Sequence, residues 1–183
     1  INTAEQFWRF LKRKGNGITD VPADRWSIDS FYDPDPLKAG KIKSRKGGFL
    51  KNIDHFDPKF FNIFPTEAIR MDPQQRFLLE VTHEALEDAG IRLEDVSGSK
   101  TSTHIGVFMN DYWDIQSSNL ERNNITPHLA MGVCLTSISN RIAYQFNLKG
   151  ASMTLDTACS SSMVAIHLAC EGLSLHKSYY YWL

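Results

Sequence analysis

Apolar and polar residues are spaced along this chain with the periods of both helices and strands. Apolar residues three and four positions apart predict helices from Thr3 to a stop signal at Gly15 and over residues 73–89, 135–146 and 160–175. Short runs of β-branched and other apolar residues predict strands over residues 103–110 and 152–156. Strands that alternate with helices indicate an α/β fold.

Two of these helices begin with capping signals. Thr3 is followed three residues later by Gln6, and Asp72 by Gln75, so each pair predicts a capping box. Gly90 is the stop signal of the second of these helices. The apolar face predicted for that helix, which we expect to pack into the core, comprises Phe77, Leu78, Val81, Ala85 and Ala89.

Residues 18–64 are predicted to be irregular, and they are rich in aromatic residues. The run Asp33-Pro34-Asp35-Pro36 excludes a helix there, because each proline restricts the residue before it. The phenylalanines expected to hold this region against the body of the protein are Phe49, Phe56, Phe60, Phe61 and Phe64. A basic stretch that ends at a Gly-Gly pair consists of Lys41, Lys43, Arg45 and Lys46. We interpret it either as a solvated hairpin or as a docking surface for an acidic carrier protein.

Composition narrows the class of protein. With 183 residues, of which 42% are hydrophobic and 22% charged, the chain can form one globular domain with a core. A net charge of −1 gives no reason to expect nucleic acid or a membrane surface as partner, and no apolar run predicts a spanning helix. The three cysteines form no Cys-x-x-Cys pair, and the six histidines show no ligand spacing around them. We therefore expect reduced thiols, a cytoplasmic protein and no metal site.

The seven residues from Asp156 to Ser162 join a predicted strand to a predicted helix. Cys159 then lies at a helix N-terminus, where free amide groups stabilise a thiolate and the oxyanion of a tetrahedral intermediate. This placement makes Cys159 a candidate covalent nucleophile, and the alternative from the residues alone is a buried, inert cysteine. Cys134 and Cys170 lie in apolar helical patterns and are expected to be buried. A serine hydrolase is disfavoured, because this turn has Cys159 at the position where the Gly-x-Ser-x-Gly motif of such enzymes has its serine.

Residues 156–170 closely resemble the active-site segment of a known family. They comprise the run Asp156-Thr157-Ala158-Cys159-Ser160-Ser161-Ser162 and the predicted helix that follows up to Cys170. The family is the β-ketoacyl synthases of polyketide synthases and animal-type fatty acid synthases. Other motifs that resemble this family, in order along nearly the whole chain, are Val21–Trp26, Gly47–Leu50, Phe56–Pro58, Phe60–Phe61, Met71–Arg76, Glu84–Gly90 and Asn140–Gly150. Small departures are Ala151, where the family commonly has proline, and Phe64, where serine is more usual.

The resemblance implies the thiolase-like fold, in which two similar α/β halves form five layers in the order αβαβα. It assigns residues 1–175 to the N-terminal half, which is incomplete because the family's first strand is missing. Residues 176–183 form a tail that does not resemble the family. The family's two catalytic histidines lie in its second half, in motifs that do not occur in this chain, and neither His167 nor His176 stands in such a context.

The resemblance also implies the activity of a condensing acyltransferase, a β-ketoacyl-acyl carrier protein synthase. In this family Cys159 would accept an acyl chain from a phosphopantetheine thioester, with its own backbone N–H in the oxyanion hole. Decarboxylation of a malonyl group on the carrier would then supply the carbanion that attacks the acyl group. No metal or bound cofactor is implied, because the substrates arrive on the phosphopantetheine of an acyl carrier protein. The implied partners are that carrier, an acyltransferase domain of the same megasynthase and, for the complete domain, a second copy.

Two other interpretations remain open. The chain can be a non-catalytic remnant or interaction module of the same fold, because the histidine motifs are absent from it. The presence of Cys159 favours descent from an active enzyme. A stand-alone thioester hydrolase needs a base near Cys159, and the sequence places none there. In every case we expect this chain alone not to catalyse condensation.

Overall fold

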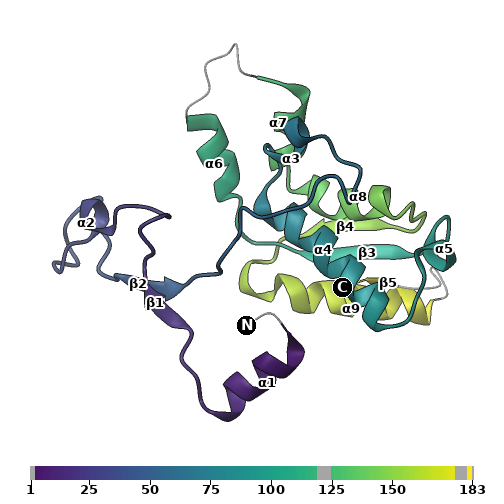
Figure 1. The fold of residues 1–183 in the computed structure, drawn as a ribbon, viewed down its shortest axis with the longest axis horizontal. Helices are drawn as coiled ribbons and strands as arrows, with labels where there is room; N and C mark the ends of the chain where they lie inside the picture. The colour runs from purple at the N-terminus through teal and green to yellow at the C-terminus, as the bar shows by residue number, and fades with distance from the viewer. Residues whose placement is uncertain (1–2, 119–124, 176–180, 183) are drawn as a thin grey trace. The chain divides into compact units, whose positions relative to one another are not determined.

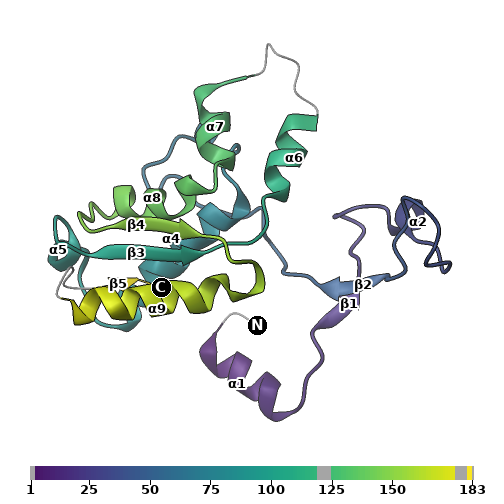
Figure 2. The same cartoon turned by 180° about the vertical axis from the view of Figure 1, so that it is seen from behind.

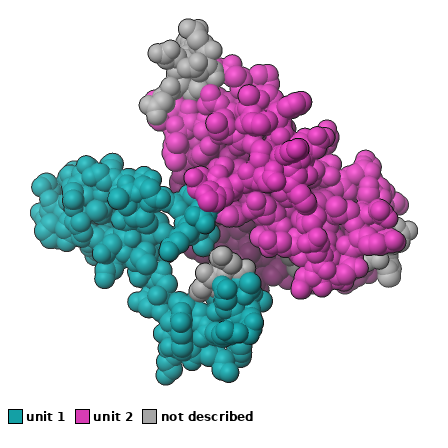
Figure 3. Space-filling model, in the orientation of Figure 1, with its two compact units in different colours: residues 1–53 teal, residues 54–183 magenta. Residues whose placement is uncertain are grey.

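The computed structural model describes residues 3–118, 125–175 and 181–182. The chain divides after Ile53 into two units, residues 1–53 and 54–183, which Figure 3 shows in different colours. No described residue of the first unit is buried. The three-stranded sheet, the hydrophobic core and Cys159 all belong to the second unit.

The first unit contains short elements and one antiparallel strand pair. Its elements are α1 (Ala4–Lys12), β1 (Ile18–Asp20), α2 (Ile28–Phe31) and β2 (Lys46–Gly48). The cap of α1 is confirmed, because the Thr3 hydroxyl accepts from the Gln6 amide at 3.2 Å. The β1–β2 pair, with Ile18 opposite Gly48, corrects the expectation of an entirely irregular region. Each strand has three residues, too few for an alternating pattern to be visible in the sequence.

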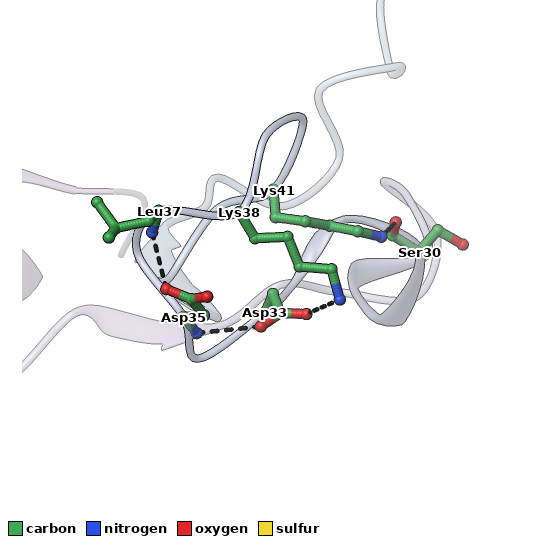
Figure 4. A network of polar contacts seen from close by, with 6 residues as sticks. All are labelled: Ser30, Asp33, Asp35, Leu37, Lys38 and Lys41. Atoms are coloured by element: carbon green, nitrogen blue, oxygen red, sulfur yellow. Dashed lines mark hydrogen bonds and ion pairs between the residues drawn. The ribbon is translucent and has the colours of Figure 1, made fainter.

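Two side chains of the basic stretch are held by groups of the same unit. Lys41 Nζ donates to the carbonyl of Ser30 at 2.6 Å (Figure 4), and Arg45 forms an ion pair with an aspartate at 2.7 Å. The neighbouring Lys38 pairs with Asp33 at 2.6 Å and lowers the pKa of that carboxyl. Fewer positively charged side chains of this stretch are therefore free to bind an acidic partner than the sequence suggests.

The second unit is a parallel sheet between helices (Figures 1 and 2). Its elements are α3 (Pro65–Ala68), α4 (Pro73–Asp88), α5 (Leu93–Val96), β3 (Ser102–Gly106), α6 (Asp111–Ser118), α7 (Pro127–Val133), α8 (Thr136–Gln145), β4 (Ser152–Leu155), the 3-10 turn η2 (Ala158–Ser160), α9 (Ser161–Ser174) and β5 (Tyr181–Trp182). The strands lie in the order β4-β3-β5, and both neighbours of β3 run parallel to it. Helix α9 covers one face of the sheet, while α8, backed by α4, covers the other. This layered arrangement confirms the α/β prediction.

The hydrophobic core lies between the sheet and the α4–α8 layer. Its most deeply buried apolar side chains include Met71, Leu79, Leu86, Ile138 and Ile142. Burial of each side chain of this size stabilises the fold by roughly 1.5–3 kcal/mol. On the other side of the sheet, α9 packs through small buried residues, Ala165 and Ala169, four positions apart. Small side chains at this spacing let the helix lie close to β3.

The sequence prediction for α4 is right about its ends and wrong about its buried face. Asp72 caps the helix by accepting from the Gln74 amide at 2.8 Å, and the helix ends at Asp88, one residue earlier than predicted. The side chains that α4 buries are Gln75, Leu79, Thr82 and Leu86. Val81, which belongs to the predicted face, is 47% exposed. Apolar periodicity misplaced the face because two of the four buried side chains are polar.

Gln75 does not close the predicted capping box. Its side-chain amide instead donates to the carbonyls of Met131 at 3.1 Å and Gly132 at 2.9 Å, at the end of α7. The Asp72 N–H also donates to the Gly132 carbonyl, at 2.8 Å. The start of α4 is thus fastened to α7, a segment more than fifty residues away that local sequence does not reveal.

Candidate active site

Cys159 lies where the edge strand β4 turns into helix α9. It occupies the middle of η2, and its side chain is exposed. The predicted strand and helix are confirmed to within one residue at each end. Cys159 therefore stands immediately before the N-terminus of a 14-residue helix, where free amide groups and the helix dipole favour negative charge.

The turn is sharp because Ala158 has a left-handed backbone conformation, with φ of 55°. For a residue with a Cβ atom this conformation costs on the order of 1–2 kcal/mol. Asp156 Oδ1 accepts from the Ala158 N–H at 2.9 Å, and the Ser160 hydroxyl donates to the Thr157 carbonyl at 2.7 Å. These local hydrogen bonds help to hold the turn in its strained conformation.

The backbone N–H of Cys159 is available to a ligand. Within residues 125–175, none of the hydrogen bonds uses this N–H as a donor. An N–H beside an attacking sulfur, at the start of a helix, can stabilise the oxyanion that forms at a thioester carbonyl. The exposed sulfur and this amide together can therefore serve acyl transfer.

Gly106, the last residue of β3, allows α9 to approach the sheet. A Cβ atom at this position would lie 2.5 Å from the carbonyl carbon of Ser161 and from the nitrogen of Ser162, closer than real Cβ contacts. The first turn of α9 is thus set directly against the strand. This contact fixes the place of Cys159 relative to the sheet.

The other two cysteines contradict the expectation that they are buried. Cys134 and Cys170 are both exposed, and Cys134 lies between α7 and α8 rather than inside a helix. A hydrogen bond with Thr136 is the main cause that lowers the pKa of the Cys134 thiol, helped by further hydrogen bonds with Thr136 and Ser137 at the start of α8. The break between the two helices falls inside an apolar run, so periodicity did not reveal it. Cys134 is the thiol that competes with Cys159 for the assignment.

Of the two histidines that the sequence analysis weighed, one lies within the described residues. His167 is exposed on α9 and lies 3.7 Å from Glu171. His176 falls outside the described residues. Two surface hollows, of about 460 Å³ beside α4 and α5 and about 430 Å³ between α7 and α8, are lined by other residues than Cys159. No group of three potential metal ligands occurs in the described ranges.

A part-buried polar network joins α3, α7 and α8 to the start of α4. Arg141 of α8 pairs with Glu67 of α3 at 2.6 Å, and the exposed fractions of the two side chains are 11% and 23%. Arg141 also donates to Gln75 Oε1 at 3.0 Å, and Gln75 in turn contacts α7. The sequence analysis placed Gln75 in a capping box and in the motif Met71–Arg76, placed Arg141 in the motif Asn140–Gly150, and assigned no role to Glu67. No local signal indicates that the two motifs meet.

Comparison with known proteins identifies the class. The family model for the β-ketoacyl synthase N-terminal domain matches residues 1–180, so the chain belongs to this family. The highly reducing polyketide synthase resH of Aspergillus sclerotiorum is 49% identical over an alignment of 177 residues, and the match covers 94% of this chain and 7% of that protein. A phenolphthiocerol/phthiocerol polyketide synthase protein of Mycobacterium tuberculosis is 46% identical over 179 residues, 97% of this chain and 10% of that protein.

Solved ketosynthase domains share the fold. The oxazolomycin ketosynthase domain of Streptomyces albus matches with a TM-score of 0.89 and 36% identity, over 97% of this chain and 31% of that chain. The ketosynthase from module 6 of the bacillaene synthase of Bacillus subtilis matches with a TM-score of 0.79 and 34% identity, over 95% of this chain and 27% of that chain. The fold is therefore thiolase-like, and the chain covers its N-terminal domain. In the part of the chain that the structure describes, no helix is long and apolar enough to cross a membrane.

Proposed function

We propose that this chain carries the acyl-accepting nucleophile of a polyketide-extending ketosynthase, and that Cys159 is that nucleophile. The observation that supports the proposal best is the exposed cysteine at a strand–turn–helix junction, whose backbone N–H donates to no group within residues 125–175. The polyketide synthases among its relatives favour polyketide over fatty acid synthesis.

The first step is an exchange of thioesters. The Cys159 thiolate attacks the carbonyl carbon of an acyl group carried on phosphopantetheine, and the new carbon–sulfur bond places the negative charge on the carbonyl oxygen. The N–H of Cys159 stabilises this oxyanion. Collapse of the intermediate breaks the bond to the phosphopantetheine sulfur, which leaves as a thiolate and takes a proton from solvent. The acyl group remains on Cys159.

The second step extends the chain. A malonyl group on the acyl carrier protein loses carbon dioxide, and the resulting carbanion attacks the acyl-Cys159 carbonyl and expels the Cys159 thiolate. The histidines that the family uses for this step are not in this chain. An acyl carrier protein and an acyltransferase domain of the same megasynthase are the partners that this chemistry requires, and the domain itself holds no cofactor.

A second candidate is a non-catalytic form of the same fold. It is the alternative that the sequence analysis left open. The two candidates differ in what the chain does with a thioester, since a nucleophile accepts an acyl group even without the second half, whereas a remnant accepts none.

The test incubates the purified chain with an acyl thioester and a malonyl-loaded carrier. We expect a mass increase of one acyl group on the protein and no β-ketoacyl product, because the carbanion needs positioned donors that the family places elsewhere. No acyl adduct would favour the non-catalytic candidate. Product above that of a Cys159→Ala control would show that a base within these residues completes the reaction.

We also propose that the complete domain is a homodimer. Strand β4 is an edge strand, which pairs with β3 and with no other strand of the described ranges. An open edge of this kind suits pairing with the same strand of a two-fold-related copy, and residues 125–132 are proposed to cross that interface. Sedimentation of the complete domain at micromolar concentration is expected to give a dimer. A monomer would contradict the proposal.

A further inference from the structure

The hydroxyl of Ser161 forms hydrogen bonds on both sides of the strained residue Ala158. The Thr157 N–H donates to Ser161 Oγ at 2.9 Å. The same Oγ lies 2.7 Å from the Ala158 carbonyl oxygen, to which it donates. The Ser161 hydroxyl therefore contacts both Thr157, the residue before Ala158, and the carbonyl group of Ala158 itself. Cys159 follows Ala158 directly in the chain.

Ser161 also ties this turn to the sheet. Its Oγ lies 3.2 Å from the carbonyl oxygen of Val107, the residue after β3, so its single proton can serve either carbonyl. The Val107 N–H donates at 2.9 Å to the carbonyl of Leu155, which ends β4. Ser161 is 4% exposed and packs at the point where Gly106 lacks a side chain. Its hydroxyl thus connects the turn with Val107 at the end of β3, and the backbone of Val107 in turn bonds to the end of β4.

The two neighbouring serines do not have this role. The Ser160 hydroxyl contacts only Thr157, at 2.7 Å to the carbonyl and 2.9 Å to the hydroxyl, so it stays within the turn. Ser162 is exposed, and its side chain forms none of the hydrogen bonds found in residues 125–175. Of these three serines, only Ser161 joins the turn to another element.

We propose that Ser161 is a positioning residue for Cys159. Its buried hydroxyl holds Ala158 in the left-handed conformation and thereby fixes the sulfur and the N–H of Cys159 for attack on a thioester. Without it, the Thr157 N–H loses its acceptor, and only the bonds from Ala158 to Asp156 and from Ser160 to Thr157 remain to offset the cost of the strained φ. The catalytic part of this inference rests on the proposed function. Ser161 acts through the turn and contacts no substrate.

The test compares the wild type with Ser161→Ala, Ser161→Thr and Ser174→Ala. Ser174 is a matched control on the same helix, because its hydroxyl donates at 3.0 Å to the carbonyl of Cys170 within α9. In Ser161→Ala we expect the rate constant for acyl loading at saturating thioester to fall about tenfold or more, with KM changed by less than about twofold. Hydrogen exchange at the Thr157 amide should accelerate about tenfold. Ser161→Thr keeps the hydroxyl and should retain both wild-type values, as should Ser174→Ala.

Wild-type loading and wild-type Thr157 exchange in Ser161→Ala would overturn the proposal. A folded Ser161→Thr that loads slowly would also overturn it, because the hydroxyl would then not be what matters. If circular dichroism shows that Ser161→Ala is unfolded, Ser161→Thr decides alone, and wild-type values in it support the proposal. If the wild-type chain accepts no acyl group, the proposed function fails, and Thr157 exchange still decides whether Ser161 holds the turn.

Discussion

Replacement of Cys159 by serine is expected to lower the rate of acyl loading from a thioester by about 100-fold or more. A thiolate attacks a thioester without assistance, whereas a serine hydroxyl stays protonated at neutral pH and needs a general base, which typically contributes about 10²–10⁴-fold. The sequence places no general base near Cys159, and the exposed His167 of α9 lies 3.7 Å from Glu171. Intact-protein mass spectrometry over a time course measures the loading rate.

Cys134→Ser and Cys170→Ser are the matched controls for this experiment. Both side chains are exposed, as that of Cys159 is, so the three substitutions are comparable in their effect on the fold. We expect the two controls to load within about twofold of the wild type. Loading at the wild-type rate in Cys159→Ser, or its loss in Cys134→Ser, would show that another thiol carries the acyl group.

Replacement of Arg141 by alanine is expected to lower the free energy of unfolding by about 3 kcal/mol. The change leaves the carboxylate of Glu67 without its cation and Gln75 Oε1 without its donor in a largely buried network. Breaking one side of a buried ion pair is costly, because the remaining charge stays desolvated. Urea unfolding followed by circular dichroism measures the loss.

The control for this effect is Arg92→Ala. Arg92 pairs with Asp95 at 2.8 Å, but the exposed fractions of the two side chains are 71% and 50%. An exposed pair of this kind contributes little to stability, because solvent screens the two charges. If Arg141→Ala costs no more than Arg92→Ala, the network does not stabilise the fold.

The elements that build the candidate site could be predicted because their signals are contiguous. The alternation in residues 152–156, the turn at Asp156 and the small residues after Cys159 lie next to one another, and β4 and α9 follow them within one residue. The same is true of the start of α4, where the carboxylate of Asp72 accepts from a backbone amide only two residues ahead. Such features depend on interactions between residues that are close together in the sequence.

Features that depend on distant segments could not be predicted. Gln75 was assigned to a local cap, but its partners lie on α7 and α8. Strand β3 was predicted over residues 103–110, but it runs from Ser102 to Gly106, so its start was right to within one residue and its end was placed too late. Its buried Thr103 hydroxyl donates to the Ser152 hydroxyl of β4 at 3.1 Å. Buried polar residues have the appearance of surface residues in a sequence until their partners are known.

The most direct test of the central claim is to locate the acyl group after the purified chain has reacted with an acyl thioester. The protein is digested, and the acylated peptide is identified by mass spectrometry, with neutral hydroxylamine used to confirm a thioester. We predict that the acyl group lies on the peptide that carries Cys159, and that hydroxylamine removes it. An acyl group on Cys134, the thiol whose pKa is lowered by hydrogen bonds with Thr136 and Ser137, with Cys159 unmodified, would contradict the assignment.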